Sequence, residues 1–176
     1  MLKCVLLDAN IIIESYVLGA WEKLVNQTEI YVSSVIVKDE ALFYSTADGE
    51  IPEPIKLERL IAEGKIKEFS ATGQEVQEFR DRFDRLFVEG LHDGEAECLA
   101  LMMHDKVTDT YFCSADATAI QALSMIGHSS LGISFERLLQ QSGLTKKLRP
   151  HYTEAFFRKQ LQIGSQNLIT KQGLKR

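Results

Sequence analysis

Hydrophobic positions fall into two kinds of segment along the chain: short apolar runs, and longer stretches with an apolar stripe at helical spacing. The first run, 2–7, is apolar without strict alternation, which is typical of a strand buried on both faces of a parallel sheet. Further strand-like runs occupy 28–32, 65–69, 110–116 and 130–133. The intervening periodicity and stop signals predict helices over 11–18, 20–26, 35–44, 55–62, 74–88, 95–103, 117–126, 135–141 and 150–163, and a loop at 48–54. This alternation predicts an α/β fold, a three-layer αβα sandwich around a central, mostly parallel sheet.

Two of the predicted strands end in an aspartate. Asp8 follows the first strand, and Asp116 ends the strand that begins at Thr110. In open α/β sheets the carboxyl edge is where ligands bind, because the strand-to-helix loops gather their polar groups there. Asp8, Asn10 or Asp116 could instead cap the helix that follows, since each can accept a hydrogen bond from a free helix N–H group. Both interpretations stay open at this point.

Three glutamates add candidate carboxylates. Ile36, Glu40 and Phe43 stand at helical spacing, so Glu40 lies on the helix face that we expect to point inward. A buried carboxylate needs a partner or a metal. Glu95 and Glu97 are about 200° apart around a helix, so they cannot share one site. Glu95 is the predicted site residue because it shares a helix face with the inward-facing Cys98, Leu99 and Met102. Glu97 is an additional candidate.

Composition places the 176-residue chain among ordinary globular domains, with 45% hydrophobic and 26% charged residues. No apolar run approaches the roughly 20 residues that cross a bilayer, and Asp8 interrupts the N-terminal apolar stretch, unlike in a signal peptide. We therefore expect a cytoplasmic protein without membrane association. Cys4, Cys98 and Cys113 are scattered in apolar sequence, which predicts buried reduced thiols and no structural zinc site.

Charge is distributed unevenly along the chain. Residues 144–176 contain eight basic residues and one acidic residue, a net charge of +7, so that the remainder contributes −12 to the overall −5. We expect a domain over 1–145 and a basic helical extension over 146–176 that packs on the same domain. An acidic body with a basic end could place a metal site beside a phosphate-binding surface, with Lys146, Lys147 and Arg149 as candidate contacts to the phosphates. The alternative is a solvated charged face.

The order Asp8, Glu40, Glu95, Asp116 resembles a PIN domain, the nuclease fold of prokaryotic toxins and several RNA-processing enzymes. The motifs that carry the resemblance are Leu-Leu-Asp8-Ala-Asn10, the glutamate after the second strand, Gly94-Glu-Ala-Glu-Cys-Leu-Ala100, Ser-Ala-Asp116 and the segment 131–144. It implies that the four acids bind Mg²⁺ or Mn²⁺, with Asn10 as a polar neighbour. It also implies an endoribonuclease, as the toxin of a toxin-antitoxin pair or as an RNA-processing enzyme, with RNA, an antitoxin protein and a second copy as partners. Many relatives carry another acid where this chain has Ala117, which puts a second metal in doubt.

Carboxylate chemistry agrees with this expectation. Clustered carboxylates repel one another and hold raised pKa values without a cation, and Mg²⁺ and Mn²⁺ prefer hard oxygen ligands. A bound metal acidifies water enough for attack on a phosphodiester. Two alternatives remain: a PIN-like interaction module without turnover, and another phosphoryl-transfer protein, either a receiver domain or a phosphatase with an aspartate nucleophile. The phosphatase would want a second aspartate where this chain has Asn10.

Overall fold

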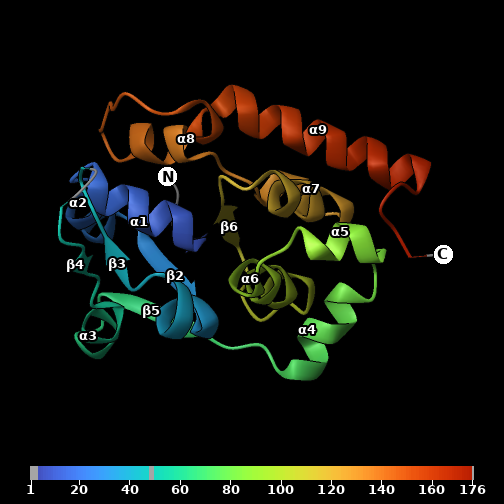
Figure 1. The fold of residues 1–176 in the computed structure, drawn as a ribbon, viewed down its shortest axis with the longest axis horizontal. Helices are drawn as coiled ribbons and strands as arrows, with labels where there is room; N and C mark the ends of the chain where they lie inside the picture. Colours follow the sequence, from blue (N-terminus) through green and yellow to red (C-terminus); the bar gives the residue numbers. More distant parts are fainter. Residues whose placement is uncertain (1–3, 48–49, 176) are drawn as a thin grey trace.

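Four parallel strands form the centre of the computed structural model, which describes residues 4–47 and 50–175 (Figure 1). Their order across the sheet is β5-β2-β1-β6, and their bounds are β1 (Cys4–Leu7), β2 (Glu29–Ser33), β5 (Ile66–Phe69) and β6 (Thr110–Cys113). Strand β1 is central: Leu6 lies opposite Tyr31 of β2 on one side and Phe112 of β6 on the other. Leu6 and Phe112 are fully buried, as a strand covered on both faces requires. Positions 2–3 of the predicted first strand lie outside the described residues.

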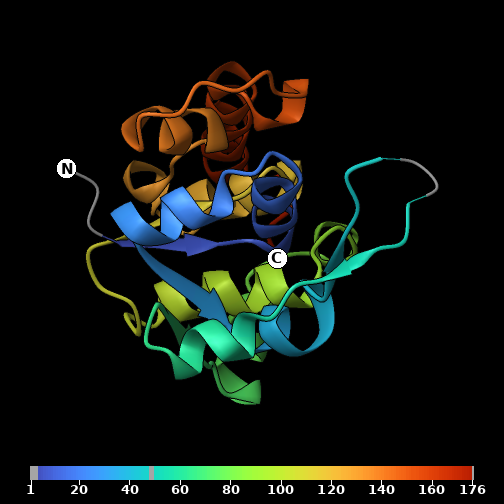
Figure 2. The same ribbon diagram turned by 90° about the vertical axis from the view of Figure 1, so that its left-hand side faces the viewer.

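Helices cover both faces of this sheet. Figure 2 shows α1, α7, α8 and α9 on one side of the strands and α3, α4 and α6 on the other. The helices are α1 (Ala9–Val17), α2 (Trp21–Gln27), α3 (Leu57–Ala62), α4 (Gly73–Arg80), α5 (Arg85–Glu89), α6 (Asp93–Met103), α7 (Ala117–Met125), α8 (Phe135–Gln141) and α9 (Glu154–Thr170). The predicted α/β class and its three-layer arrangement are confirmed.

The predicted helix over 35–44 was wrong in its second half. It ends as a π-helix, η1 (Ile36–Glu40), in which the N–H of Ala41 donates to the carbonyl of Ile36. The chain then forms a two-stranded antiparallel ribbon of β3 (Phe43–Tyr44) and β4 (Glu53–Pro54), which projects from the body in Figure 2. Phe43 is 56% exposed, so it does not share an inward stripe with Glu40. The last two positions of the loop expected at 48–54 are strand β4, and positions 48–49 lie outside the described residues.

The predicted helix over 74–88 is two helices, α4 and α5. Asp84 starts the second by accepting a hydrogen bond from the N–H of Phe87, an N-cap that an uninterrupted helix would not allow. The backbone at this break pairs with the C-terminal end of the chain: the N–H of Asp84 donates to the carbonyl of Gly173, and Phe83 forms a bridge with Leu174. Periodicity could not reveal the break because its partner lies about ninety positions away.

Two more predicted elements differ from the structure. The strand expected at 130–133 is the short 3-10 helix η2 (Ser129–Leu131), followed by one isolated parallel bridge between Phe112 and Gly132. The helix expected at 150–163 begins as a separate turn, η3 (Pro150–Tyr152). Helix α9 then starts after Thr153, whose side chain accepts from the N–H of Phe156, and it continues to Thr170.

The three cysteines are all unbridged, and Cys98 and Cys113 are buried, which confirms the expectation for those two thiols. Within the described part of the chain, no helix combines the length and the apolar character needed to span a membrane.

The C-terminal extension is docked on the rest of the domain through close contacts. Helix α9 packs along α7 (Figure 1). Gly164 of α9 lies so close to Gln121 of α7 that a Cβ at position 164 would stand 2.8 Å from the Gln121 Cα and would overlap its carbonyl oxygen. Phe157 packs in the same way against Gly132. The extension therefore depends on small residues at its contact with the body.

We expect Gly164→Ala to lower the free energy of unfolding by about 1–3 kcal/mol, the usual cost of overpacking, because backbone atoms cannot easily move away from the new methyl group. Gly73→Ala is the matched control, since Gly73 also lies in a helix but no atom would stand within 4 Å of its Cβ. Urea denaturation of both variants measures the effect. Equal stability of Gly164→Ala and wild type would contradict a close α7–α9 contact.

Candidate acidic site at the carboxyl edge of the sheet

Asp8 and Asp116 meet where β1 and β6 end. The N–H of Asp8 donates to the carbonyl of Cys113 at 3.1 Å, which extends the pairing of the two strands by one step. Ser114 connects the two acids: its hydroxyl donates to Oδ2 of Asp8 at 2.9 Å and accepts from the N–H of Asp116 at 3.0 Å. Parallel pairing of two strands far apart in sequence thus brings these aspartates to one place.

Glu40 and Glu95 reach the same edge from η1 and α6. Oε1 of Glu40 accepts from the N–H of Gly94 at 2.8 Å, and Oε2 of Glu95 accepts from the N–H of His92 at 3.1 Å. A Cβ at position 94 would overlap the carboxylate of Glu40, so only glycine lets Glu40 approach the first turn of α6. The Gly94-Glu95 pair of the sequence motif therefore contributes in two ways. Glu95 supplies a carboxylate, and Gly94 leaves the space that the carboxylate of Glu40 occupies.

Burial and mutual repulsion change the acidity of this group. The pKa of Asp8 rises to about 7, chiefly because the side chain is removed from water; hydrogen bonds from Ser114 and Ala9 oppose the rise, and the charges of Glu40 and Asp116 add to it. The pKa of Glu95 rises to about 9, first through burial and then through the charges of Asp8 and Asp116. Because the pKa values of Asp8 and Glu95 respond to the charges of the neighbouring carboxylates, we call Asp8, Glu40, Glu95 and Asp116 the acidic cluster.

The helix-capping alternative holds for one aspartate and not for the other. Asp116 does cap α7, since its Oδ1 accepts from the N–H of Ala119 at 2.9 Å. Asp8 stands at the N-cap position of α1, but its side chain makes no capping hydrogen bond and is only 1% exposed. Asn10 lies within the first turn of α1 and is exposed. Capping therefore does not explain why Asp8 is a buried acid.

Glu97 is buried but lies apart from the acidic cluster. Its carboxylate accepts from the hydroxyl of Ser34 at 2.8 Å, from the N–H of Val35 at 2.8 Å and from the N–H of Ala71 at 3.1 Å. These bonds join the segments that follow β2 and β5. Helix α6 is buried on all sides from Gly94 to Met102, so burial alone could not distinguish Glu95 from Glu97; their hydrogen-bond partners do.

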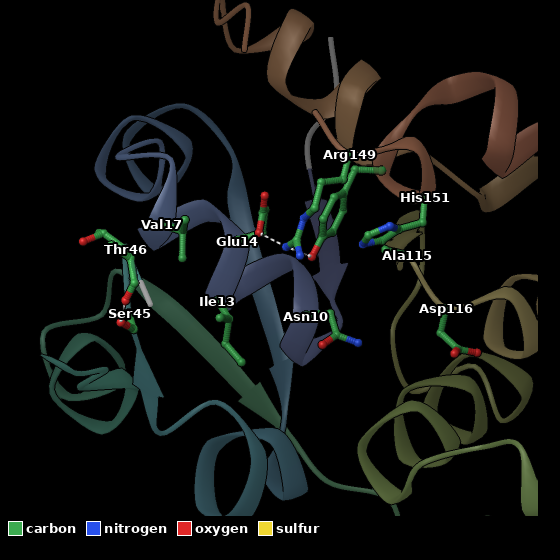
Figure 3. A pocket seen from close by; sticks show the side chains of 12 residues that line it. Asn10, Ile13, Glu14, Val17, Ser45, Thr46, Ala115, Asp116, Arg149 and His151 are labelled. Carbon is green, nitrogen blue, oxygen red and sulfur yellow. Dashed lines mark hydrogen bonds and ion pairs between the residues drawn. The ribbon is translucent and has the colours of Figure 1, made fainter. Parts of the chain in front are cut away.

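A cleft of about 990 Å³ opens beside the acidic cluster, and Figure 3 shows Asn10 and Asp116 in its wall. Asp116 belongs to both, so the cleft leads to the cluster. The other lining residues come from α1, the β3 end of the ribbon, the end of β6 and the segment around η3: Ile13, Glu14, Val17, Ser45, Thr46, Ala47, Ala115, Arg149, His151 and Tyr152.

Sequence reasoning identified only part of this cleft. Arg149 lines it, whereas Lys146 and Lys147 are exposed and do not. Glu14, His151 and Tyr152 were missed. Glu14 stands four residues after Asn10, on the same face of α1, and that spacing is the one signal that could have pointed to it.

The acidic cluster has the chemistry of a site for a hard cation. Oε2 of Glu40, Oε1 of Glu95 and Oδ2 of Asp116 accept no hydrogen bond from the described residues, and no lysine, arginine or histidine among those residues forms an ion pair with the cluster. Within 4–47 and 50–175, no three acidic, histidine or cysteine side chains are arranged to coordinate a metal ion. The donors fit Mg²⁺ or Mn²⁺ in type and charge, and cation binding would draw their free oxygens together. Without a cation, the raised pKa of Asp8 also suits proton exchange near neutral pH.

Comparison of the chain with protein-family models, with curated proteins and with solved structures gives no match. The resemblance to PIN domains therefore rests on the residues described above, and it remains a hypothesis.

The raised pKa values make the stability of the metal-free protein depend on pH. The folded values, about 7 for Asp8 and about 9 for Glu95, exceed the ordinary 3.8 and 4.5, so the folded protein holds these protons more tightly than the unfolded chain does. The stability that these two groups contribute is fully present below about pH 4 and is lost as the pH rises through the folded pKa values.

In the presence of a chelator, we expect Tm to fall between about pH 6 and about pH 9 by at least about 2–4 °C, the shift that about 1 kcal/mol produces in a domain of this size. Asp8→Asn should reduce that fall, and the exposed control Asp39→Asn should leave it unchanged. Parallel Tm curves for wild type and Asp8→Asn would contradict the burial of an ionisable Asp8.

Proposed function

We propose that this protein is a divalent-metal-dependent ribonuclease that cleaves single-stranded RNA, with the acidic cluster as its active site. The observation that carries the proposal is the convergence of Asp8, Glu40, Glu95 and Asp116, from four separate segments, at the carboxyl edge of a parallel sheet. Burying the carboxylates of Asp8 and Glu95 without a cation is costly. A fold that nevertheless holds them at a ligand-binding edge is well suited to take up Mg²⁺ or Mn²⁺.

Each acid is held by a contact from its surroundings. Ser114 orients Asp8, the N–H of Gly94 fixes Glu40, the N–H of His92 fixes Glu95, and the N–H of Ala119 fixes Asp116. Each of these contacts uses one carboxylate oxygen, and a bound cation would draw the free oxygens of the cluster together. When bound, the cation would stabilise charge on the phosphate and lower the pKa of water.

The cleft supports a nucleic-acid strand as the substrate. Its volume of about 990 Å³ matches the upper end of the size range of ligand pockets, about 300–1,000 Å³. The amide of Asn10 and the guanidinium of Arg149 are donors for phosphate and sugar oxygens, and His151 offers a ring against which a base could stack. We infer that a single strand enters along α1 and brings one phosphodiester to Asp116.

The receiver-domain alternative fits less well. Receiver sheets have the order 2-1-3-4-5, in which the first strand lies between the second and third. Here β1 lies between β2 and β6, the second and fourth strands of the parallel sheet in chain order. An aspartate-nucleophile phosphatase would want a second aspartate at position 10, where this chain has an amide. The inactive interaction module makes a different prediction, RNA binding without cleavage.

The proposal is tested with a panel of end-labelled single-stranded RNAs in millimolar Mn²⁺ or Mg²⁺. We expect cleavage by wild type, none in excess EDTA, and a loss of at least about 100-fold in Asp8→Asn and Glu95→Gln, because each removes a charged ligand of the cation. Glu97→Gln should keep most of the activity and instead lose about 1–3 kcal/mol of stability, since it weakens a buried network of three hydrogen bonds.

The Glu95→Gln protein, purified in parallel, controls for contaminating nucleases. Cleavage that resists EDTA would indicate proton transfer by Asp8 without a metal. Binding of RNA without cleavage by any preparation would support the interaction module. Loss of activity in Glu97→Gln with retention in Glu95→Gln would contradict the assignment of Glu95.

A further inference from the structure

The cationic group of the cleft, Arg149, is held by an acid in the structure. Its Nη2 lies 2.5 Å from Oε2 of Glu14, and Figure 3 shows this ion pair across the cleft from Ser45 and Thr46. The pair occupies Nη2 of Arg149, so a phosphate that binds this nitrogen must displace Glu14. Among the described residues Glu14 forms no hydrogen bond with the acidic cluster, so the cluster does not account for the pair.

The two members of the pair differ in exposure and in the kind of segment that carries them. The Glu14 side chain is 7% exposed and sits on α1, which is packed against the sheet. The Arg149 side chain is 62% exposed and extends from the irregular segment that precedes η3. If the pair opens, the guanidinium is the group that moves, while the carboxylate stays in the wall of the cleft.

Tyr152 limits how far the guanidinium can move. The ring centroid of Tyr152 lies 5.2 Å from Cζ of Arg149, and the phenol oxygen accepts from Nη2 at 3.4 Å. Tyr152 itself is buried and packs edge-on against Phe135 of α8. This platform keeps Arg149 at the cleft when its bond to Glu14 is broken.

We propose that the Glu14–Arg149 pair is a latch on the substrate channel, in which a phosphodiester of single-stranded RNA displaces Glu14 and takes over the guanidinium of Arg149. This inference rests on the proposed function, because it assumes that RNA occupies the cleft. A phosphate must compete with the carboxylate of Glu14 for Arg149, so a mononucleotide or inorganic phosphate gains little binding free energy there. An extended strand, which also contacts Asn10 and His151 in the wall of the cleft, gains enough to open the latch. Glu14 would thus set a preference for chains over single nucleotides.

The test measures binding of a fluorescent single-stranded RNA by anisotropy, in EDTA so that no cleavage occurs, across a series of salt concentrations. We expect Arg149→Gln to weaken binding about tenfold and to reduce the salt slope by about 0.7, the value of one lost phosphate contact on a single strand. Glu14→Gln should tighten binding about tenfold, because Arg149 no longer has to leave a charged partner. The double variant should bind like Arg149→Gln alone, since the gain depends on Arg149.

Arg158→Gln is the matched control. Arg158 also forms an ion pair with a glutamate, Glu154 at 2.6 Å, and has a side chain 71% exposed, but it lies on α9 and does not line the cleft. Its substitution should change binding less than twofold. Arg149→Gln leaves Glu14 buried without its partner, so thermal melts must show that each variant is folded at the assay temperature. In the double variant both groups are neutral, which separates a loss of binding from a loss of fold.

The outcomes separate the latch from the ribonuclease proposal. If Glu14→Gln tightens binding equally with and without Arg149, the effect is general repulsion and the latch is wrong. If Arg149→Gln binds and cleaves like wild type, the latch is wrong while the ribonuclease stands. If the binding pattern is as expected but no RNA is cleaved, the latch stands and the protein is a binding module. Absence of RNA binding by wild type would overturn the latch, and absence of cleavage in Mn²⁺ or Mg²⁺ as well would overturn the ribonuclease.

Discussion

Burial of carboxylates at the carboxyl edge of the parallel sheet is the constraint on which the site depends. Asp8 and Glu95 are 1% and 2% exposed, and removal from water is the main cause of their raised pKa values. The usual relief for a buried acid is a basic partner. Within the described residues the acidic cluster has none, whereas Glu14, in the same helix as Asn10, has Arg149. The acid in the cleft wall is therefore paired with a basic residue, and the described acids of the cluster are not.

Backbone amides and one serine hold this arrangement. Ser114 joins the ends of β1 and β6, and the absence of a side chain at Gly94 lets η1 approach the start of α6. The π-helix matters here, because it ends at Glu40 and turns the chain away toward β3. A continuous α-helix through position 44 would have carried the chain past this edge. Local features that look irregular are thus the ones that bring Glu40 into contact with α6.

The sequence predicted the parts of this structure that depend on short-range patterns. Apolar runs identified the strands of the sheet, and the acids placed after them identified the edge at which Asp8 and Asp116 meet. It did not predict features that depend on distant partners: the break at Asp84, which pairs with Gly173, and the cleft wall, where Glu14 meets Arg149 across most of the chain. The stripe argument selected Glu95 over Glu97, but helix α6 is buried all round. The distinction follows from the bonds of Glu97 to Ser34, Val35 and Ala71, which no periodicity reveals.

The central claim is that Asp8, Glu40, Glu95 and Asp116 together hold a divalent cation. Anomalous X-ray diffraction from crystals grown in millimolar Mn²⁺ tests it most directly, because the anomalous signal locates manganese without assuming its ligands. We expect a peak among these four side chains, with ligand oxygens at about 2.0–2.6 Å, the range for hard cations on oxygen. The peak should be lost in crystals of Glu95→Gln and retained in Glu97→Gln. A manganese peak elsewhere on the protein with none at the acidic cluster, or an ordered cluster whose carboxylates remain protonated and bonded to one another, would contradict it.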